Sequence, residues 1–249
     1  MAATAAAGPL PITVANNDRN KMDQDQRLDA IIDRMRAIGP LDEVAVPPEL
    51  AEPKSFLKVL RANHYNWTSP HFRKLFGMRF RVRIPPIEQL NSIFYPRPEY
   101  DIPVFIFFCM VTKRKVIAHL NVCCPFDDDE YRAKWVDPLT GILGRYEPFD
   151  SNDRYPEWMK KYRNDCTIYG LFKRDRLEDV SDCCFEYLDY YAAQVAESQP
   201  VTDPERLAQV QAFQDQWVDD IRTQDKAQGM IAKMIGADTA RRIFYEVTT

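Results

Sequence analysis

Six cysteines and three histidines are the residues with which this chain could hold a metal ion or build a nucleophilic site. No two cysteines have the Cys-x-x-Cys spacing typical of zinc and iron–sulfur sites, and the histidines lie far apart. We therefore expect no bound metal, and we expect the cysteines to be buried free thiols in a reducing compartment. The residues concerned are Cys109, Cys123, Cys124, Cys166, Cys183, Cys184, His64, His71 and His119.

Charged residues form three further groups that could bind ligands or partners. The acidic run from Asp127 to Glu130 lacks the spacing of a calcium loop and is typical of a helix N-terminus. Asp225 and Lys226 precede an expected helix, where such a pair is usually a solvated cap. The third group alternates with apolar residues on an expected strand and could bind carboxylates or an acidic protein, or form a solvated or salt-bridged face of the strand. Its members are Arg79, Arg81 and Arg83.

Several familiar kinds of chemistry have no counterpart in this sequence. There is no Gly-x-Gly-x-x-Gly, no P-loop and no Gly-x-Ser-x-Gly, and only 8 glycines occur in 249 residues. The net charge of −4 gives no overall electrostatic basis for binding nucleic acid. No apolar run approaches the roughly 18 residues that a membrane-spanning helix needs. Composition and spacing alone therefore indicate a soluble α/β domain.

The spacing of apolar residues changes along the chain, and it predicts the helices and strands that must position these residues. Residues 1–22 are expected to form a disordered tail, and residues 23–249 a single domain. A helix over 23–38 precedes alternating, strand-like segments, and helical spacing returns in the last third. Short connections between consecutive strands favour an antiparallel sheet, which helices must cover on both faces. Strands are predicted over 56–66, 72–84, 90–95, 104–111, 116–124 and 167–172, a loop over 137–157, and later helices over 175–196, 204–221, 230–234 and 237–247.

Five segments together carry a resemblance to a known family, and their order and spacing match over roughly residues 55–249. They are Phe72–Lys74, Ile93–Phe105, Arg154–Trp158, Tyr169–Phe172 and Gln224–Val247. In these segments the chain resembles the ferredoxin-dependent bilin reductases. The resemblance implies an α/β three-layer sandwich, α/β/α, with a central, mostly antiparallel six-stranded sheet and a bilin between this sheet and the C-terminal helices.

The same resemblance implies a bilin oxidoreductase with no bound cofactor. Reduced ferredoxin supplies electrons one at a time, and the protein supplies protons to biliverdin IXα or a dihydrobiliverdin, giving a phytobilin. The expected partners are thus the bilin and a transiently bound, acidic ferredoxin, with neither nucleic acid nor membrane. We also expect a monomer in the cytoplasm, or in the plastid stroma if the source is a photosynthetic eukaryote.

At three strand positions where the resemblance leads us to expect two acids and a histidine, this chain has other residues. The matching residues are Met78, Asn91 and Phe108, or Cys109 in place of Phe108 if the strand is shifted by one. Asp225 matches an acid that relatives use at the A-ring. The resemblance therefore implies A-ring reduction, with Asp225 as proton donor and Asn91 as the second catalytic residue.

The remaining expected contacts concern substrate binding. Arg154 and Lys226 could pair with the two bilin propionates, and Trp158 is expected beside the substrate together with the three strand residues. Two other functions stay open: reduction of a different linear tetrapyrrole, as by an enzyme close to red chlorophyll catabolite reductase, or a bilin- or haem-binding carrier without catalysis. The altered strand positions motivate both, and the retained Asp225 and Lys226 argue against the carrier.

Overall fold

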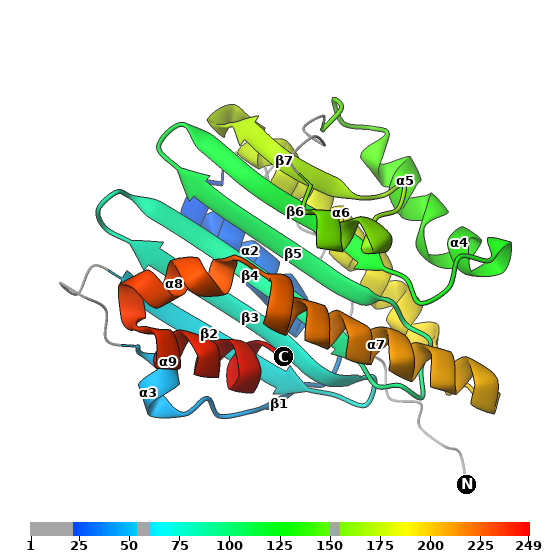
Figure 1. Ribbon diagram of the computed structural model, residues 1–249. Coiled ribbons are helices and arrows are strands. Elements are labelled where there is room, and N and C mark those ends of the chain that lie inside the picture. Colours follow the sequence, from blue (N-terminus) through cyan, green and yellow to red (C-terminus); the bar gives the residue numbers. More distant parts are fainter. Residues whose placement is uncertain (1–21, 54–59, 150–154) are drawn as a thin grey trace, which may run out of the picture.

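The computed structural model describes residues 22–53, 60–149 and 155–249, and every structural statement below concerns these residues. They form a seven-stranded sheet in which each strand is antiparallel to the next one along the chain (Figure 1). The strands are β1 (Asp42–Glu43), β2 (Leu60–Thr68), β3 (Phe72–Val82), β4 (Ile87–Pro96), β5 (Val104–Thr112), β6 (Lys115–Cys123) and β7 (Ile168–Lys173).

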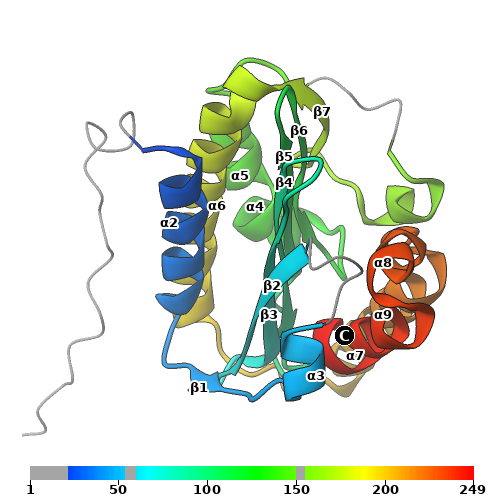
Figure 2. The same ribbon diagram turned by 90° about the vertical axis from the view of Figure 1, so that its left-hand side faces the viewer.

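Alternation along the strands gives the sheet two apolar faces. In β3, Leu75 belongs to the core on one face, whereas Phe76, Met78 and Phe80 belong to the core on the other. Since successive side chains of a strand point to opposite faces, both faces must be covered. Figure 2 shows helices on each side of the sheet, so the α/β/α sandwich predicted from the sequence is confirmed.

One face of the sheet is covered by α2 (Gln24–Arg36) and α6 (Leu177–Glu197), with α4 (Asp129–Trp135) and α5 (Asp137–Leu143) beside them. Helix α2 begins at a capping box in which Asp23 and Gln26 bond to each other's backbone N–H groups. The apolar stripe of α6 is buried against the sheet. Its members are Leu177, Val180, Cys184, Leu188 and Tyr191.

The opposite face is covered by α7 (Pro204–Gln224), α8 (Ala227–Ile235) and α9 (Ala237–Arg242), followed by a π-helical turn at Ile243–Thr248. A 3₁₀-helix at Glu157–Tyr162 completes this layer. Gly236 separates α8 from α9 with φ of 92°, a left-handed value that favours glycine. This second layer provides the lid over the cavity described below.

The structure corrects three details of the predicted layout. The sheet has seven strands rather than six, because β1 is too short to show any periodicity in sequence. The predicted loop over 137–157 contains α5, which begins immediately after α4. A one-turn helix, α3 (Pro48–Ala51), lies in the proline-rich connector. The strand predicted over 56–66 begins outside the described residues, which omit 56–59. The predicted tail also lies outside them, except for residue 22.

Candidate active site

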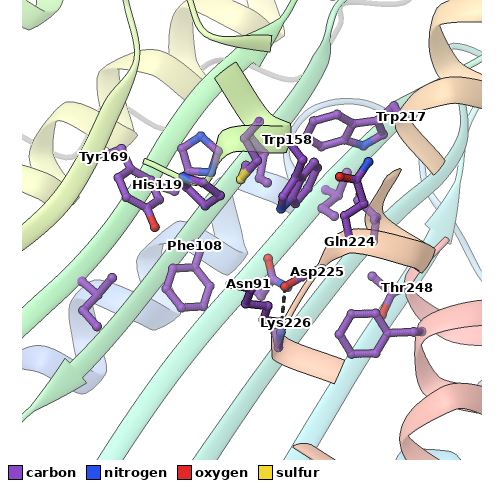
Figure 3. Close-up of a pocket in the computed structure, with 18 of the residues that line it drawn as sticks. Asn91, Phe108, His119, Trp158, Tyr169, Trp217, Gln224, Asp225, Lys226 and Thr248 are labelled. Carbon is purple, nitrogen blue, oxygen red and sulfur yellow. Dashed lines mark hydrogen bonds between the residues drawn. The ribbon is translucent and has the colours of Figure 1, made fainter. Parts of the chain in front are cut away.

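A cavity of about 730 Å³ lies between the sheet and the layer formed by α7 and α8 (Figure 3). Its floor comes from β3 to β7, and its other walls from residues 156–159, the α7–α8 connection and the chain's last turn. This volume lies within the range of small-molecule and cofactor sites. Aromatic and aliphatic side chains dominate the lining, and a few polar groups converge on it.

Five residues in mutual register form a row across the cavity floor. Met78 pairs with Asn91, Asn91 with Phe108, Phe108 with His119, and His119 with Tyr169. All five line the cavity, and we call them the cavity row. The row contains no carboxylic acid, so any acid acting on a bound molecule must come from another element.

His119 is the only ionisable nitrogen base of the cavity row. Its side chain is 3% exposed, and its Nε2 lies 3.4 Å from the hydroxyl of Tyr155. The rings of Tyr155 and Tyr169 both contact it edge-on. Burial lowers the pKa of His119 to about 3, so the imidazole is neutral at physiological pH. It can therefore donate or accept a hydrogen bond at the cavity floor without carrying charge.

Asp225 supplies a carboxyl group from the opposite side of the cavity, at the connection between α7 and α8. Its Oδ1 accepts a hydrogen bond from the backbone N–H of Ala227 at 2.8 Å. Burial raises the pKa of Asp225 more than this hydrogen bond lowers it. Glu157 also lines the cavity, but it is exposed and forms an ion pair with Lys160 at 2.6 Å. Among the described residues, Asp225 is thus the desolvated acid of this site.

The position of the α7–α8 connection is fixed by a buried carboxylate, Asp220, one turn earlier in α7. Its side chain is 2% exposed and forms an ion pair with Lys161 at 2.6 Å. It also accepts hydrogen bonds from Tyr162 and from Nε2 of Gln224, the latter at 2.6 Å. Gln224 lines the cavity, so Asp220 ties the 3₁₀-helix and the end of α7 into one wall.

The structure brings most of the predicted site residues together. The following line the cavity: Met78, Asn91, Phe108, Trp158, Asp225 and Lys226. Lys226 is exposed and forms no ion pair with any residue that the structure describes. Arg154 lies outside the described residues.

Cys109 is in a different place, and its predicted contact with a substrate is wrong. It follows Phe108 in β5 and therefore points to the opposite face, where it is fully buried in the core beneath α2 and α6. Burial raises the pKa of its thiol to about 12. All six cysteines are free, and no three His, Cys, Asp or Glu residues within the described ranges come together as a metal site.

The arginine stripe of β3 does not reach the cavity either. Arg79 is buried on the face beneath α2, where it forms ion pairs with Asp25, Asp29 and Glu88. Arg81 shares the partners Asp25 and Glu88. These two arginines therefore hold α2 against the sheet instead of binding a carboxylate in the cavity.

The model of the family described as "Ferredoxin-dependent bilin reductase" matches residues 28–247 of this chain. The chain belongs to this family. The match includes the whole cavity floor and nearly all of both helical layers. Within the described residues, no helix is long and apolar enough to cross a membrane.

Individual members of the family resemble the chain at moderate to low identity. A 15,16-dihydrobiliverdin:ferredoxin oxidoreductase from Nostoc punctiforme is 31% identical over 166 residues, which cover 63% of this chain and 65% of that protein. A phycoerythrobilin:ferredoxin oxidoreductase from Gloeobacter violaceus is 24% identical over 69% of this chain and 71% of its own length. The crystal structure of tomato phytochromobilin synthase in complex with biliverdin superposes with a TM-score of 0.77 at 15% identity, over 90% of this chain and 82% of that one. That structure shares the fold.

Proposed function

We propose that this protein reduces a linear tetrapyrrole, biliverdin IXα or a dihydrobiliverdin, at its A-ring with electrons from ferredoxin. Family membership supports the class of reaction. The observation that carries the assignment is the desolvated carboxyl of Asp225, which faces a large apolar cavity whose floor has no acid. The names of the relatives, which refer to dihydrobiliverdin and phycoerythrobilin, support a bilin as substrate.

Binding is driven by burial of the apolar ring system between the sheet and α7–α8. Phe108 and Trp158 offer aromatic surface, and Asn91 and His119 offer polar atoms for lactam and pyrrole groups. Lys226, exposed at the cavity, is the proposed partner of one propionate. Arg154 remains the predicted partner of the other. A bound bilin also removes water from around Asp225, which raises the pKa of this carboxyl further.

Reduction of one double bond consumes two electrons and two protons. Each reduced ferredoxin gives up one electron, so two ferredoxins act in turn, and the bilin carries the unpaired electron between the two steps. Asp225 gives one proton to the ring carbon nearest to it and regains a proton from solvent, and the second proton reaches the bilin from solvent. The neutral His119 and Asn91 hold the pyrrole groups in place during these steps. This assignment places the protonated carbon on the side of the bilin that faces the α7–α8 connection.

The proposal is tested by adding biliverdin and recording absorption spectra with and without a ferredoxin-reducing system. We expect a one-to-one complex, turnover only when reduced ferredoxin is present, and no turnover with NADPH alone. A complex that never turns over with either bilin indicates a carrier. Failure to bind biliverdin and dihydrobiliverdin, with binding of a chlorophyll-derived linear tetrapyrrole, indicates the alternative reductase. Turnover with NADPH alone contradicts the ferredoxin requirement.

A further inference from the structure

Positive charge gathers at one end of the sheet, although the chain as a whole carries a net charge of −4. Five exposed cations lie on the β3–β4 turn, on the β5–β6 turn and at the end of β7, which are at the same end of the sheet (Figure 1). We call this group the basic edge. Its members are Arg83, Lys113, Arg114, Lys115 and Lys173.

Two members of the basic edge carry the same charge at directly opposite positions on neighbouring strands. Lys115 on β6 and Lys173 on β7 are direct cross-strand partners. Like charges at directly opposite positions destabilise a sheet. A lysine on the outermost strand β7 can serve to prevent edge-to-edge aggregation, but β6 is an inner strand, so this reason does not apply to Lys115. The pairing costs stability that a partner of opposite charge would recover.

The positive charge of the basic edge is not neutralised within the described part of the protein. None of its five members forms an ion pair with a described residue, in contrast to Arg81, which pairs with Asp25 and Glu88. The sequence from Arg81 to Ile87 and from Val111 to Val116 contains no acid. Asp175, just beyond β7, is the acid nearest in sequence to Lys173.

The β5–β6 turn and the end of β7 are held in a defined arrangement. The hydroxyl of Thr112 accepts a hydrogen bond from the backbone N–H of Lys115 at 3.0 Å and donates to the carbonyl of the same residue. Arg174 donates to the carbonyl of Thr112 at 3.0 Å, and its backbone N–H donates to the carbonyl of Arg114 at 3.2 Å. The end of β7 is therefore joined to the β5–β6 turn, and four of the five cations are positioned before any partner arrives.

The basic edge continues the floor of the cavity. Lys115, Ile117 and His119 alternate on one face of β6, and the latter two line the cavity. At about 3.3 Å per residue, Lys115 is about 7 Å along the strand from Ile117 and about 13 Å from His119. A protein that contacts Lys115 therefore lies only two positions along β6 from Ile117, which lines the cavity.

We propose that the basic edge is the docking surface for the acidic electron-donor protein, a ferredoxin, and that Lys115 and Lys173 are its central contacts. The proposal rests on the proposed function for the identity of the partner, and it adds where that partner binds. Charge complementarity speeds encounter and fixes orientation, which suits a donor that must bind, deliver one electron and leave. The five cations span three separate segments, a wider area than two bilin propionates require.

The test uses the full chain and an oxidised plant-type [2Fe–2S] ferredoxin as probe, with surface plasmon resonance at several salt concentrations. The double variant K115Q/K173Q removes two charges from the basic edge. The matched control R36Q/K134Q removes two charges from α2 and α4, away from this edge. We expect K115Q/K173Q to bind ferredoxin about tenfold more weakly than wild type with a smaller salt dependence, and the control to stay within about twofold.

A second double variant, K113Q/R114Q, changes only the β5–β6 turn and should weaken ferredoxin binding in the same direction. Biliverdin affinity is measured in parallel and should be unchanged in every variant. Weakened biliverdin binding by K115Q/K173Q with normal ferredoxin binding overturns the proposal in favour of a propionate site. Unchanged ferredoxin binding in both edge variants also overturns it, even if bilin turnover is normal. Salt-sensitive ferredoxin binding that depends on the edge supports the docking surface, even if the wild type fails to reduce biliverdin and the proposed function falls.

Discussion

Oδ1 of Asp225 accepts a hydrogen bond from the backbone N–H of Ala227 at 2.8 Å, so this acid both bonds to the first residue of α8 and lines the cavity. Such local bonds to backbone N–H groups are ordinary for aspartate, and this one fixes where the carboxyl group points. It also offers a conservative substitution. Asparagine keeps an oxygen acceptor for this bond but cannot act as an acid.

Replacing Asp225 with asparagine should separate its two roles. D225N is expected to bind biliverdin as wild type does and to keep its unfolding free energy within about 1 kcal/mol, because the hydrogen bond from the N–H of Ala227 is retained. Reduction should slow by about 10²- to 10⁴-fold, the usual contribution of a general acid. Stopped-flow spectra with reduced ferredoxin should show a bilin radical that persists. A normal rate and product in D225N contradicts the role of Asp225.

The pH dependence of the same variant supplies a further check. Burial raises the pKa of Asp225 in the folded protein, so the protonated acid persists to higher pH than an ordinary aspartate. The kcat of the wild type should therefore fall as pH rises through this raised pKa. The residual kcat of D225N should lack that descending limb. A descending limb of the same shape in both proteins means that another group titrates.

Lys226 should strengthen the binding of a bilin with free propionates but not of one with esterified propionates. Replacing this exposed lysine with glutamine is expected to weaken biliverdin binding about fivefold, because a solvent-exposed charge pair contributes at most about 1 kcal/mol. Biliverdin dimethyl ester cannot form the pair, so its affinity should be the same for wild type and K226Q. Fluorescence titration with both ligands measures this. Equal losses for acid and ester mean that Lys226 contacts the ring system instead.

Much of the fold follows from periodicity because each strand is covered on both faces. Segments such as 104–111 and 116–124 have boundaries set by proline and by the charged turn, and β5 and β6 match them within two residues. The register between strands follows from short connections, so Met78, Asn91 and Phe108 fall in line on the cavity floor. The sequence does not determine on which face of the sheet each residue lies. A shift of one residue exchanges Phe108 for Cys109, and only the structure decides it.

Other site residues depend on contacts between distant segments, which a single sequence does not reveal. Asp220 gains its role from Tyr162 and Lys161, which lie about sixty residues earlier and have no shared pattern with α7. The alternation of Arg79 with apolar residues is compatible with ligand binding, yet α2 supplies acidic partners for it. A signal for His119 was present: it alternates in phase with Ile117 on a strand next to Phe108. Extending the register by one strand places His119 in the cavity row.

The neutral state of His119 makes the protein sensitive to acid. In the unfolded chain its imidazole takes up a proton below pH 6.5, whereas in the folded protein it does so only near pH 3. The free energy of unfolding therefore falls as pH decreases from 6.5 toward 3. H119Q, which keeps a polar side chain without this titration, should lose about 2 kcal/mol less stability than wild type between pH 6.5 and 4. Urea denaturation at each pH measures the difference, and parallel curves contradict it.

Lys74 on β3 should produce a dependence of the same sign at alkaline pH. Its Nζ donates to the carbonyl of Thr249 at 3.1 Å, and burial, with Arg73 and Arg222 nearby, lowers its pKa from 10.5 to about 8. Between these two values the unfolded chain holds a proton that the folded protein has lost. This contribution to the free energy of unfolding therefore rises with pH from about 8 to 10.5 and is constant below that window.

Replacing Lys74 with methionine tests this contribution, because methionine retains the buried apolar stem without a charge. Cysteines and tyrosines also titrate between pH 8 and 10.5. They are present in both wild type and K74M, so their effect cancels in the difference between the two. The difference in unfolding free energy between wild type and K74M should therefore shift in favour of wild type as pH rises from 8 to 10.5, by about 1–2 kcal/mol once partial solvent screening is allowed for. Chemical denaturation across this range provides the measurement. A constant difference means that Lys74 keeps an ordinary pKa in the folded protein and that its charge is solvated.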